Sequence, residues 1–354
     1  MNVFESGIDL NRAFYVDVVG PIVAPWPHDA ALLGWGSDAL GYDTERSTDH
    51  GWGPRLQVFV AGPDVVAVRN ALDAALPEHF HERPVRYGWD ATVVSHHVEV
   101  GTRSDWLRRW LGRDPAAGMS NLDWLLTPQQ LLLGVVRGAV FHDGSGALTA
   151  VRDSLAWYPD DVWRWMLACQ WRRIAQAEAF PLRAAEVGDD LGLRLVAGQL
   201  AQEVVRLAFL LAKEYRPYAK WFGTTFAALP SAERLGPLLA RLVDASDVAS
   251  RERALIALFE AVAGEHDATG ATGPVDPAVR SYHSREFPVL LADRFADACA
   301  ARVSDPWLRV LPLVGSVDQF VDSTDVLQHP ARVDRLAALY TDAQTRSGPS
   351  ATSP

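Results

Sequence analysis

The residues best suited to chemistry lie near the start of the chain, where a glycine-serine pair is followed by acidic residues. Gly36 and Ser37 come directly after a short apolar run, and Asp49 follows Ser47 and Thr48. A tight glycine turn can bring backbone N–H groups and a hydroxyl close to a polyphosphate without a clashing Cβ. Carboxylates on a neighbouring strand can hold Mg²⁺, which neutralises phosphate charge and positions an attacking oxygen. These residue types and their spacing meet the requirements of nucleotidyl transfer.

Three charged residues elsewhere could complete a site of this kind. Glu99 stands between two valines in a stretch of β-branched residues, which predicts a strand, and could supply a further carboxylate. Arg55 follows the acidic segment, and Lys220 is one of two lysines in a chain rich in arginine. Either cation could offset the charge of a leaving pyrophosphate, a task for which lysine serves as a compact point charge.

An α+β head is predicted to position these residues, because helical and strand patterns alternate over the amino-terminal part of the chain. The expected order is helix, strand, turn, strand, helix and strand, over residues 10–23, 31–33, 34–37, 55–60, 65–76 and 92–100. Asp49 is expected to lead into the second of these strands.

The character of the sequence changes after residue 103, where tryptophan, leucine, alanine and arginine dominate. Helical spacing is found over residues 123–134, 161–179, 191–215, 231–263 and 275–302. We therefore expect a small head over residues 1–112, or as far as about 150, and an all-α domain over residues 113–344. The Ser-, Thr- and Pro-rich end, residues 345–354, is expected to be disordered.

These motifs resemble those of a known superfamily. Gly36-Ser37 with Ser47-Thr48-Asp49 is similar to the glycine-serine turn and the Asp-x-Asp strand of the nucleotidyltransferases. The longer run over residues 47–55 resembles an uncharacterised bacterial family, domain of unknown function 4037. Further matches to that family follow in order along most of the chain, at residues 98–100, 188–192, 217–223 and 318–325.

The resemblance implies a minimal nucleotidyltransferase sheet followed by a helical domain. It also implies Mg²⁺-dependent transfer of a nucleoside monophosphate from a nucleoside triphosphate, with ATP the expected nucleotide, to an unidentified acceptor. Gly36 and Ser37 match the phosphate-binding turn. Asp49 and Glu99 match metal-binding catalytic carboxylates. Lys220 of the helical domain and Arg55 are the candidate phosphate contacts.

The sequence departs from the superfamily pattern at Gly51, where a second carboxylate is expected. A glycine cannot bind metal through a side chain, which leaves three alternatives. Asp43 or Glu45 from the preceding loop could take over, one metal ion could suffice, or catalysis could be lost while nucleotide or partner binding persists.

The candidate residues also have ordinary structural explanations. Asp49 could cap a turn, and Glu99 could be a solvated strand residue. Arg55 could pair with a nearby carboxylate, and Lys220 could lie along a helix end with its charge in water. Histidines at 96 and 97 point to opposite faces of a regular strand, so they do not form one metal site.

Composition narrows the class of protein further. The formal net charge of -11 does not favour nucleic acid or an anionic membrane as a partner. The two cysteines form no disulfide framework, and the first residues do not have the pattern of a secretory signal. From these features we expect a cytoplasmic protein without a membrane span.

Overall fold

The predicted amino-terminal helix is present as one continuous segment. In the computed structural model, which describes residues 4–341, α1 (Gly7–Phe14) continues through a π-helical turn, η1 (Tyr15–Val19), into α2 (Gly20–Val23). Proline at position 25 follows the end of α2, where a helix can no longer accommodate the missing amide. The helix predicted over residues 10–23 is therefore confirmed.

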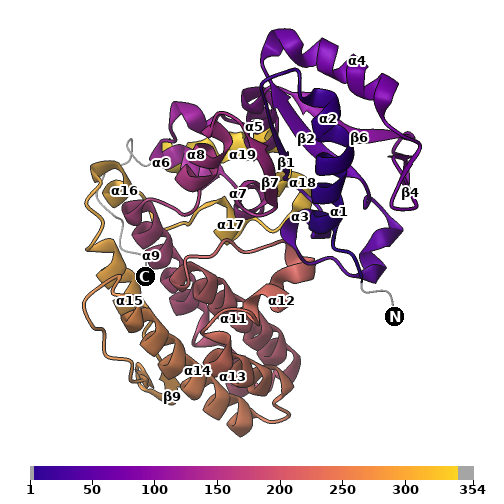
Figure 1. The fold of residues 1–354 in the computed structure, drawn as a ribbon. Helices are drawn as coiled ribbons and strands as arrows, with labels where there is room; N and C mark the ends of the chain where they lie inside the picture. Colours follow the sequence, from indigo (N-terminus) through magenta and orange to yellow (C-terminus); the bar gives the residue numbers. More distant parts are fainter. Residues whose placement is uncertain (1–3, 342–354) are drawn as a thin grey trace. The chain divides into compact units, whose positions relative to one another are not determined.

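Five strands form one mixed sheet in the order β5–β6–β2–β1–β7 (Figure 1). They are β1 (His28–Leu32), β2 (Arg55–Val60), β5 (Arg86–Tyr87), β6 (Ser95–Gly101) and β7 (Ala139–Asp143). β2 and β6 are parallel, and the other neighbours are antiparallel. The parallel pair requires a crossover, which includes α4 (Val65–Ala75). The three predicted strands are confirmed, and β7 is an additional edge strand.

The two faces of the sheet differ because side chains alternate along each strand. On one face, Leu56, Val58 and Val60 of β2 pack with apolar residues of α1, η1, α2 and α4, and Figure 1 shows α1, α2 and α4 on this side. On the other face, β2 presents Arg55 and Gln57, both buried although polar. The predicted chemistry therefore belongs to the second face.

Shorter elements complete this part of the chain. They are α3 (Ser37–Leu40), η2 (Glu45–Asp49), η3 (Gly62–Asp64), β3 (His79–Phe80), β4 (Arg83–Pro84), α5 (Arg103–Leu111), η4 (Pro115–Ala117), α7 (Gln129–Val136) and α8 (Ala147–Ser154). α5 covers the second face of the sheet, where its Trp106 packs edge-on against Phe59 of β2.

The chain divides into two compact units. The first contains the residues up to 119 together with residues 129–156, and the second contains residues 120–128 and those from 157 onwards. The sequence analysis placed the boundary between the two domains at residue 112, or as late as about 150. In the structure, the first unit is interrupted after residue 119, resumes at residue 129 and ends at residue 156. The predicted fold class, a mixed-sheet head and a helical domain, is confirmed. The predicted disordered tail, residues 345–354, lies outside the described residues.

The second unit is built mainly from helices. They are α6 (Asn121–Leu126), α9 (Asp160–Ala177), α10 (Phe180–Glu186), α11 (Asp190–Leu211), η5 (Ala219–Trp221), α12 (Phe222–Phe226), α13 (Ala232–Asp244), α14 (Val248–Ala268), α15 (Asp293–Ala300), α16 (Pro306–Val310), α17 (Val317–Phe320), α18 (Thr324–Leu327), α19 (Pro330–Val333), η6 (Asp334–Ala337) and α20 (Ala338–Thr341). α9 packs against both α11 and α15. Among the described residues, none of the helices combines the length and apolarity that a membrane span requires.

Prolines account for two differences from the predicted helices. The helix expected over residues 123–134 is interrupted before Pro128, because the residue before a proline avoids the helical conformation. The prediction of a helix over residues 275–302 is wrong for the first half of this range, where β8 (Arg280–Tyr282) and β9 (Arg285–Val289) form a hairpin. Pro277 and Pro288 make a continuous helix unfavourable there.

A neutral histidine lies in the core of the second unit. His266 of α14 is fully buried, its Nδ1 accepts a hydrogen bond of 3.1 Å from the indole N–H of Trp171, and its Nε2 lies 3.0 Å from Thr272 Oγ1. Burial lowers the pKa of His266 to about 4, and the charge of Asp267 only partly opposes this.

We predict that acid destabilises the second unit through His266. Between pH 6.5 and about 4 the unfolded chain binds a proton that the folded ring does not, so stability falls as the pH is lowered through this range. The loss should reach about 3 kcal/mol at most. Urea unfolding at several pH values, followed by the NMR signal of the Trp171 indole N–H, measures it. An unchanged pH dependence in His266→Gln would contradict this assignment.

Candidate functional site

The glycine-serine turn is shaped by the packing of its own neighbours. Gly36 has a φ of 105°, a conformation that residues with side chains rarely adopt. A Cβ at this position would collide with the carboxylate of Asp38 and the guanidinium of Arg55. Ser37 begins α3 and is half-buried, and its hydroxyl makes no hydrogen bond within the described chain. The turn thus offers one free hydroxyl beside a closely packed ion pair.

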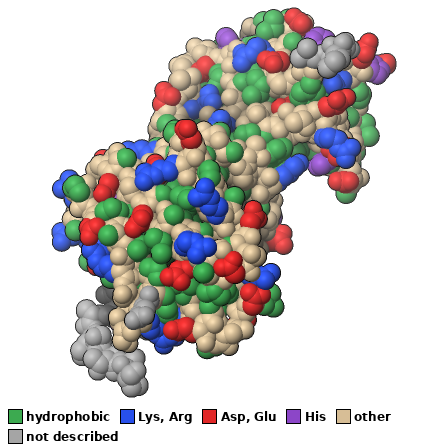
Figure 2. Space-filling view, turned by 90° about the horizontal axis from the view of Figure 1, so that it is seen from below, with side chains coloured by type: hydrophobic (Ala, Val, Ile, Leu, Met, Phe, Trp, Pro, Cys, Tyr) green, Lys and Arg blue, Asp and Glu red, His purple; other side chains and the backbone are tan. Residues whose placement is uncertain are grey.

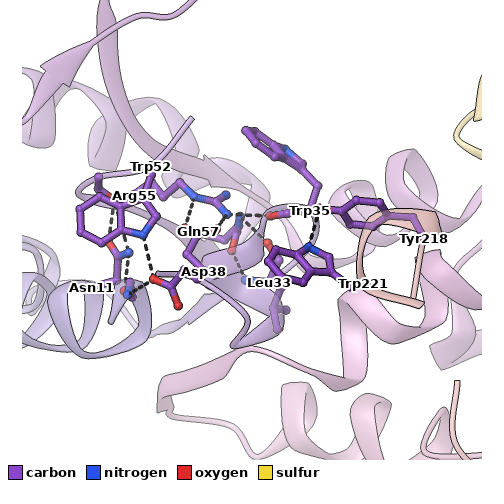
Figure 3. A network of polar contacts seen from close by, with 12 residues as sticks. Asn11, Leu33, Trp35, Asp38, Trp52, Arg55, Gln57, Tyr218 and Trp221 are labelled. Atoms are coloured by element: carbon purple, nitrogen blue, oxygen red, sulfur yellow. Dashed lines mark hydrogen bonds and ion pairs between the residues drawn. The ribbon is translucent and has the colours of Figure 1, made fainter. Parts of the chain in front are cut away.

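A buried ion pair between Arg55 and Asp38 lies at the centre of this region (Figure 3). Arg55 Nε donates to Asp38 Oδ2 and Nη2 donates to Oδ1, both at 2.8 Å, a bidentate geometry that favours strong binding. Nη2 also donates to the Trp35 carbonyl oxygen at 2.6 Å. Burial disfavours the charged guanidinium, but Asp38 more than offsets this and raises the pKa of Arg55. Arg55 therefore pairs with a carboxylate, as the structural explanation for this residue predicted.

Asn11 of α1 holds the backbone that carries this ion pair (Figure 3). Its Oδ1 accepts a hydrogen bond from the Arg55 amide at 2.6 Å. Its Nδ2 donates to the carbonyl oxygens of Gly7 at 2.8 Å and Gly53 at 3.3 Å. A single buried amide thus joins the start of α1 to the entry of β2.

Asp43 is already engaged by the same part of the molecule. Its Oδ2 accepts hydrogen bonds from the Gly7 amide at 2.6 Å and from the indole N–H of Trp52 at 2.8 Å. The carboxylate is therefore held at the start of α1, and Asp43 does not replace the carboxylate missing from position 51. Glu45, the other candidate, is exposed on η2.

Asp49 is placed differently from the sequence-based expectation. It ends the 3₁₀ helix η2, and β2 begins only at Arg55, so the expectation that Asp49 leads directly into a strand is wrong. Gly51 and Gly53, with φ values of 61° and 151°, keep the intervening backbone from extending as a strand. The Asp49 side chain is 68% exposed, and its Oδ1 lies 2.9 Å from His50 Nδ1.

Glu99 lies on the expected strand but already has partners. It is in register with Gln57 of β2, on the face that carries Arg55. Its Oε2 accepts a hydrogen bond from the indole N–H of Trp106 at 3.2 Å, and its Oε1 forms an ion pair with Arg109. Both partners belong to α5, so the negative charge of Glu99 is balanced within the first unit.

The space beside Gly51 is filled by an indole ring. A Cβ on Gly51 would lie 3.0 Å from the ring of Trp35 and 3.6 Å from that of Trp89, at a backbone conformation that favours glycine. The guanidinium carbon of Arg55 lies 4.7 Å from the centroid of the Trp35 ring, a cation–π contact. Glycine at position 51, where a second carboxylate was expected, thus leaves room for the Trp35 ring that packs on the ion pair.

The residues present do not fit a preformed Mg²⁺ site. Asp49 lies on an exposed turn, Glu99 is paired with Arg109, and position 51 has no side chain. Within residues 4–341, no three or more Asp, Glu, His or Cys side chains come together as a metal site. The predicted roles of Asp49 and Glu99 as magnesium ligands stay predictions.

Lys220 lies in the second unit, unlike the other predicted site residues. It is exposed on η5, and its Nζ lies 4.9 Å from the centroid of the Trp221 ring. The indole N–H of Trp221 donates to the Tyr218 hydroxyl at 2.8 Å (Figure 3). A cation–π contact is therefore the interaction that the structure gives Lys220.

Aromatic side chains around Arg55 were not predicted as part of the site. Trp35 is 48% exposed, and its ring centroid lies 5.8 Å from that of Trp89. Trp89 and Tyr87 both pack on His97 of β6, at 5.0 and 4.3 Å. Burial raises the pKa of Tyr87 and lowers that of His97, so both side chains are neutral at pH 7. These residues come from three separate segments of the chain, and no local sequence pattern predicts that they associate.

A broad groove of about 1240 Å³ opens at the opposite ends of the same strands. It is lined near the start of β1 and the end of β2, and none of the predicted site residues contributes to it. Tyr15 Oη lies 2.9 Å from His28 Nε2 at its edge, and the His28 ring lies 4.6 Å from that of His142. This groove and the glycine-serine turn are therefore separate features.

The family match found by comparison with known proteins covers mainly residues of the second unit. The family model of the domain of unknown function DUF4037 matches residues 124–222. The chain resembles this family. The match contains residues 188–192 and most of residues 217–223, two of the segments on which the predicted resemblance rests, and so confirms it. The glycine-serine turn and the acidic segment lie outside the matched range.

One solved structure is similar over most of the chain. It is a nucleotidyltransferase-like protein from Exiguobacterium sibiricum 255-15, 14% identical, with 78% of this chain and 82% of that chain covered and a TM-score of 0.34. No curated protein matches the sequence.

We predict that Asp38→Asn destabilises the first unit strongly. It leaves the Arg55 guanidinium, only 6% exposed, without its counter-charge, which should cost about 3–5 kcal/mol in free energy of unfolding. Denaturant unfolding measures the loss. Asp49→Asn is the matched control: its carboxylate is 68% exposed, and the change should cost below about 1 kcal/mol. Equal effects of the two substitutions would contradict a central role for the ion pair.

Proposed function

We propose that the first unit is a nucleotide-binding head that does not transfer nucleotides. The observation that carries this proposal is the packing of Trp35 against Gly51, which fills the space where a second carboxylate side chain would stand. The pairing of Glu99 with Arg109 supports it, because a carboxylate that binds a metal ion or takes up a proton must first leave its cation. This is the third of the alternatives that Gly51 left open.

The glycine-serine turn supports binding of a phosphate group. Gly36 lets the backbone turn with a positive φ just before Ser37, and Ser37 has a hydroxyl without a partner in the described chain. Trp35, half-exposed beside this turn, offers an aromatic face on which a base can stack, and every base has such a face. The ligand in this proposal is a nucleotide held by its phosphate and its base.

The competing function is the enzyme that the resemblance implies. In that case Asp49 and Glu99 bind Mg²⁺, Glu99 also acts as base, and a nucleoside monophosphate passes from ATP or another triphosphate to an acceptor. Lys220 and Arg55 would then contact the phosphates. This function needs Glu99 to part from Arg109 and Arg55 to part from Asp38, whereas the binding function needs neither change.

The protein surface does not favour a nucleic acid as the ligand. The formal net charge is -11. Figure 2 shows basic and acidic side chains interspersed over the visible face. A basic stripe that tracks a phosphate backbone is the usual feature of such binding. The proposed ligand is therefore a single nucleotide.

We predict that nucleoside triphosphates raise the thermal midpoint of the first unit to the same extent with and without Mg²⁺. At about 100 times the dissociation constant, a ligand adds roughly 2.7 kcal/mol, which shifts the midpoint by a few degrees. Ser37→Ala should reduce the shift, and Trp35→Ala should reduce it further, because each removes one of the two proposed contacts. Ser246→Ala, an exposed serine of the second unit, is the matched control and should change nothing.

The same measurement on Asp49→Ala separates the two functions. The binding function predicts a nucleotide shift that survives this substitution. A shift that depends on Mg²⁺ and is lost in Asp49→Ala would favour the enzyme. If no nucleotide shifts the midpoint of a cooperatively unfolding protein, the head does not bind nucleotides.

A further inference from the structure

The second unit contains a small pocket that the proposed function does not use. Its volume is about 310 Å³, at the lower end of the range typical of small-molecule sites. Residues from the ends of α11 and α14, from the start of α13 and from α9 line it. The lining is mostly apolar, but it also contains a cation, a hydroxyl and a carboxylate, which belong to Lys213, Ser231 and Glu265.

Lys213 occupies a backbone position that usually belongs to glycine. It follows the end of α11 with a φ of 55°, and its amide donates to the Leu210 carbonyl oxygen at 3.3 Å. The next amide, that of Glu214, donates to the Phe209 carbonyl oxygen at 3.0 Å. Glycine is common at this point of a helix end, because a Cβ is strained in the left-handed conformation. A lysine held in a strained conformation beside a pocket is typical of a functional site.

The ammonium group of Lys213 is held in place without using its N–H donors. Its Nζ lies 4.1 Å from the centroid of the Trp163 ring, a cation–π contact with a ring that also lines the pocket. The indole N–H of Trp163 donates to the Leu210 carbonyl oxygen at 2.7 Å, which fixes this ring. Lys213 also forms an ion pair with Asp160, but its Nζ and the Asp160 Oδ1 are 3.8 Å apart, too far for a hydrogen bond.

Two further polar groups of the pocket lack close partners. The Ser231 hydroxyl is buried and has no hydrogen-bond partner among the described residues. Ser231 stands at the cap position of α13, yet its side chain accepts no helix N–H. The Glu265 side chain is 25% exposed, and its ion pair with Arg234 spans 3.7 Å, again too far for a hydrogen bond. Since buried polar groups normally have partners, the pocket is incomplete without a bound molecule.

We propose that this pocket binds a free amino acid with an apolar side chain. Lys213 and Ser231 hold its carboxylate, Glu265 holds its ammonium group, and the apolar walls cover its side chain. The compact ammonium of lysine suits a single carboxylate. A ligand with one charge would leave the opposite charge of the pocket without a partner, so the zwitterion is favoured over a simple acid or amine. The pocket lies wholly within the second unit, so it does not depend on nucleotide binding by the first.

The test compares amino acids with analogues that lack one charged group. L-Alanine, L-valine and L-leucine are titrated into the full chain by isothermal titration calorimetry. The tightest binder is then compared with the matching acid, which has no amine, and with the matching amine, which has no carboxylate. Each analogue should bind at least about tenfold more weakly, because each leaves one charge of the pocket unpaired. Binding of none of the three amino acids overturns the proposal, as does an analogue that binds as tightly as its parent.

Variants assign the binding to this pocket. Lys213→Met and Glu265→Gln should each weaken amino-acid binding by at least about tenfold. Arg241→Met, which removes an exposed charge from α13, is the matched control and should keep the full affinity, and so should Ser37→Ala of the first unit. Unchanged affinity in Lys213→Met overturns the proposal, as does loss of binding in Ser37→Ala.

Lys213→Gly separates a binding role from a structural one. Glycine removes the ammonium group and relieves the left-handed strain at the end of α11. Binding should therefore be lost, while the thermal midpoint without a ligand should not fall. This variant also replaces Lys213→Met if the methionine variant does not fold. An amino-acid affinity that survives in Lys213→Gly overturns the proposed site.

Discussion

The geometry of the head depends on one buried ion pair. Asp38 and Arg55 come from opposite ends of the loop between β1 and β2, and their bidentate contact closes this loop on itself. Desolvating two charges is costly, so the pair persists only because its geometry is good and further hydrogen bonds satisfy its remaining groups. The Trp35 carbonyl oxygen does this directly, and Asn11 fixes the backbone on which Arg55 stands. Gly36 is required because the pair leaves no room for a Cβ.

This pair also limits the chemistry of the turn. In a metal-dependent nucleotidyltransferase, a hydrated ion brings positive charge to the phosphates at the moment of reaction. Here the positive charge beside the turn is a guanidinium that is fixed, buried and already neutralised by Asp38. In the proposed binding function, a ligand at Ser37 would therefore meet little net charge, and a hydroxyl and an indole face would hold it. This is why we propose binding of a nucleotide without its transfer.

Local patterns were enough to predict most of the longer elements, and prolines and distant contacts explain what they missed. β2 was predictable because Leu56, Val58 and Val60 alternate along it, and α9 and α11 because apolar residues recur at helical spacing. Asp49 was misplaced because two glycines with positive φ interrupt the approach to β2, and conformations of this kind are not encoded by residue type alone. The environments of Glu99 and Trp35 depend on Arg109 and Gly51, which become neighbours only when the chain folds.

The chain passes from the first unit to the second and back before the sheet is complete. β1 pairs with β2 on one side and with β7 on the other, yet β7 follows a segment, residues 120–128, that belongs to the second unit. During synthesis, the side of β1 that pairs with β7 stays unpaired until residue 143 has left the ribosome. Neither unit is a continuous stretch of chain, so a fragment ending at residue 112 would keep β1 as an unpaired edge, open to pairing with other chains.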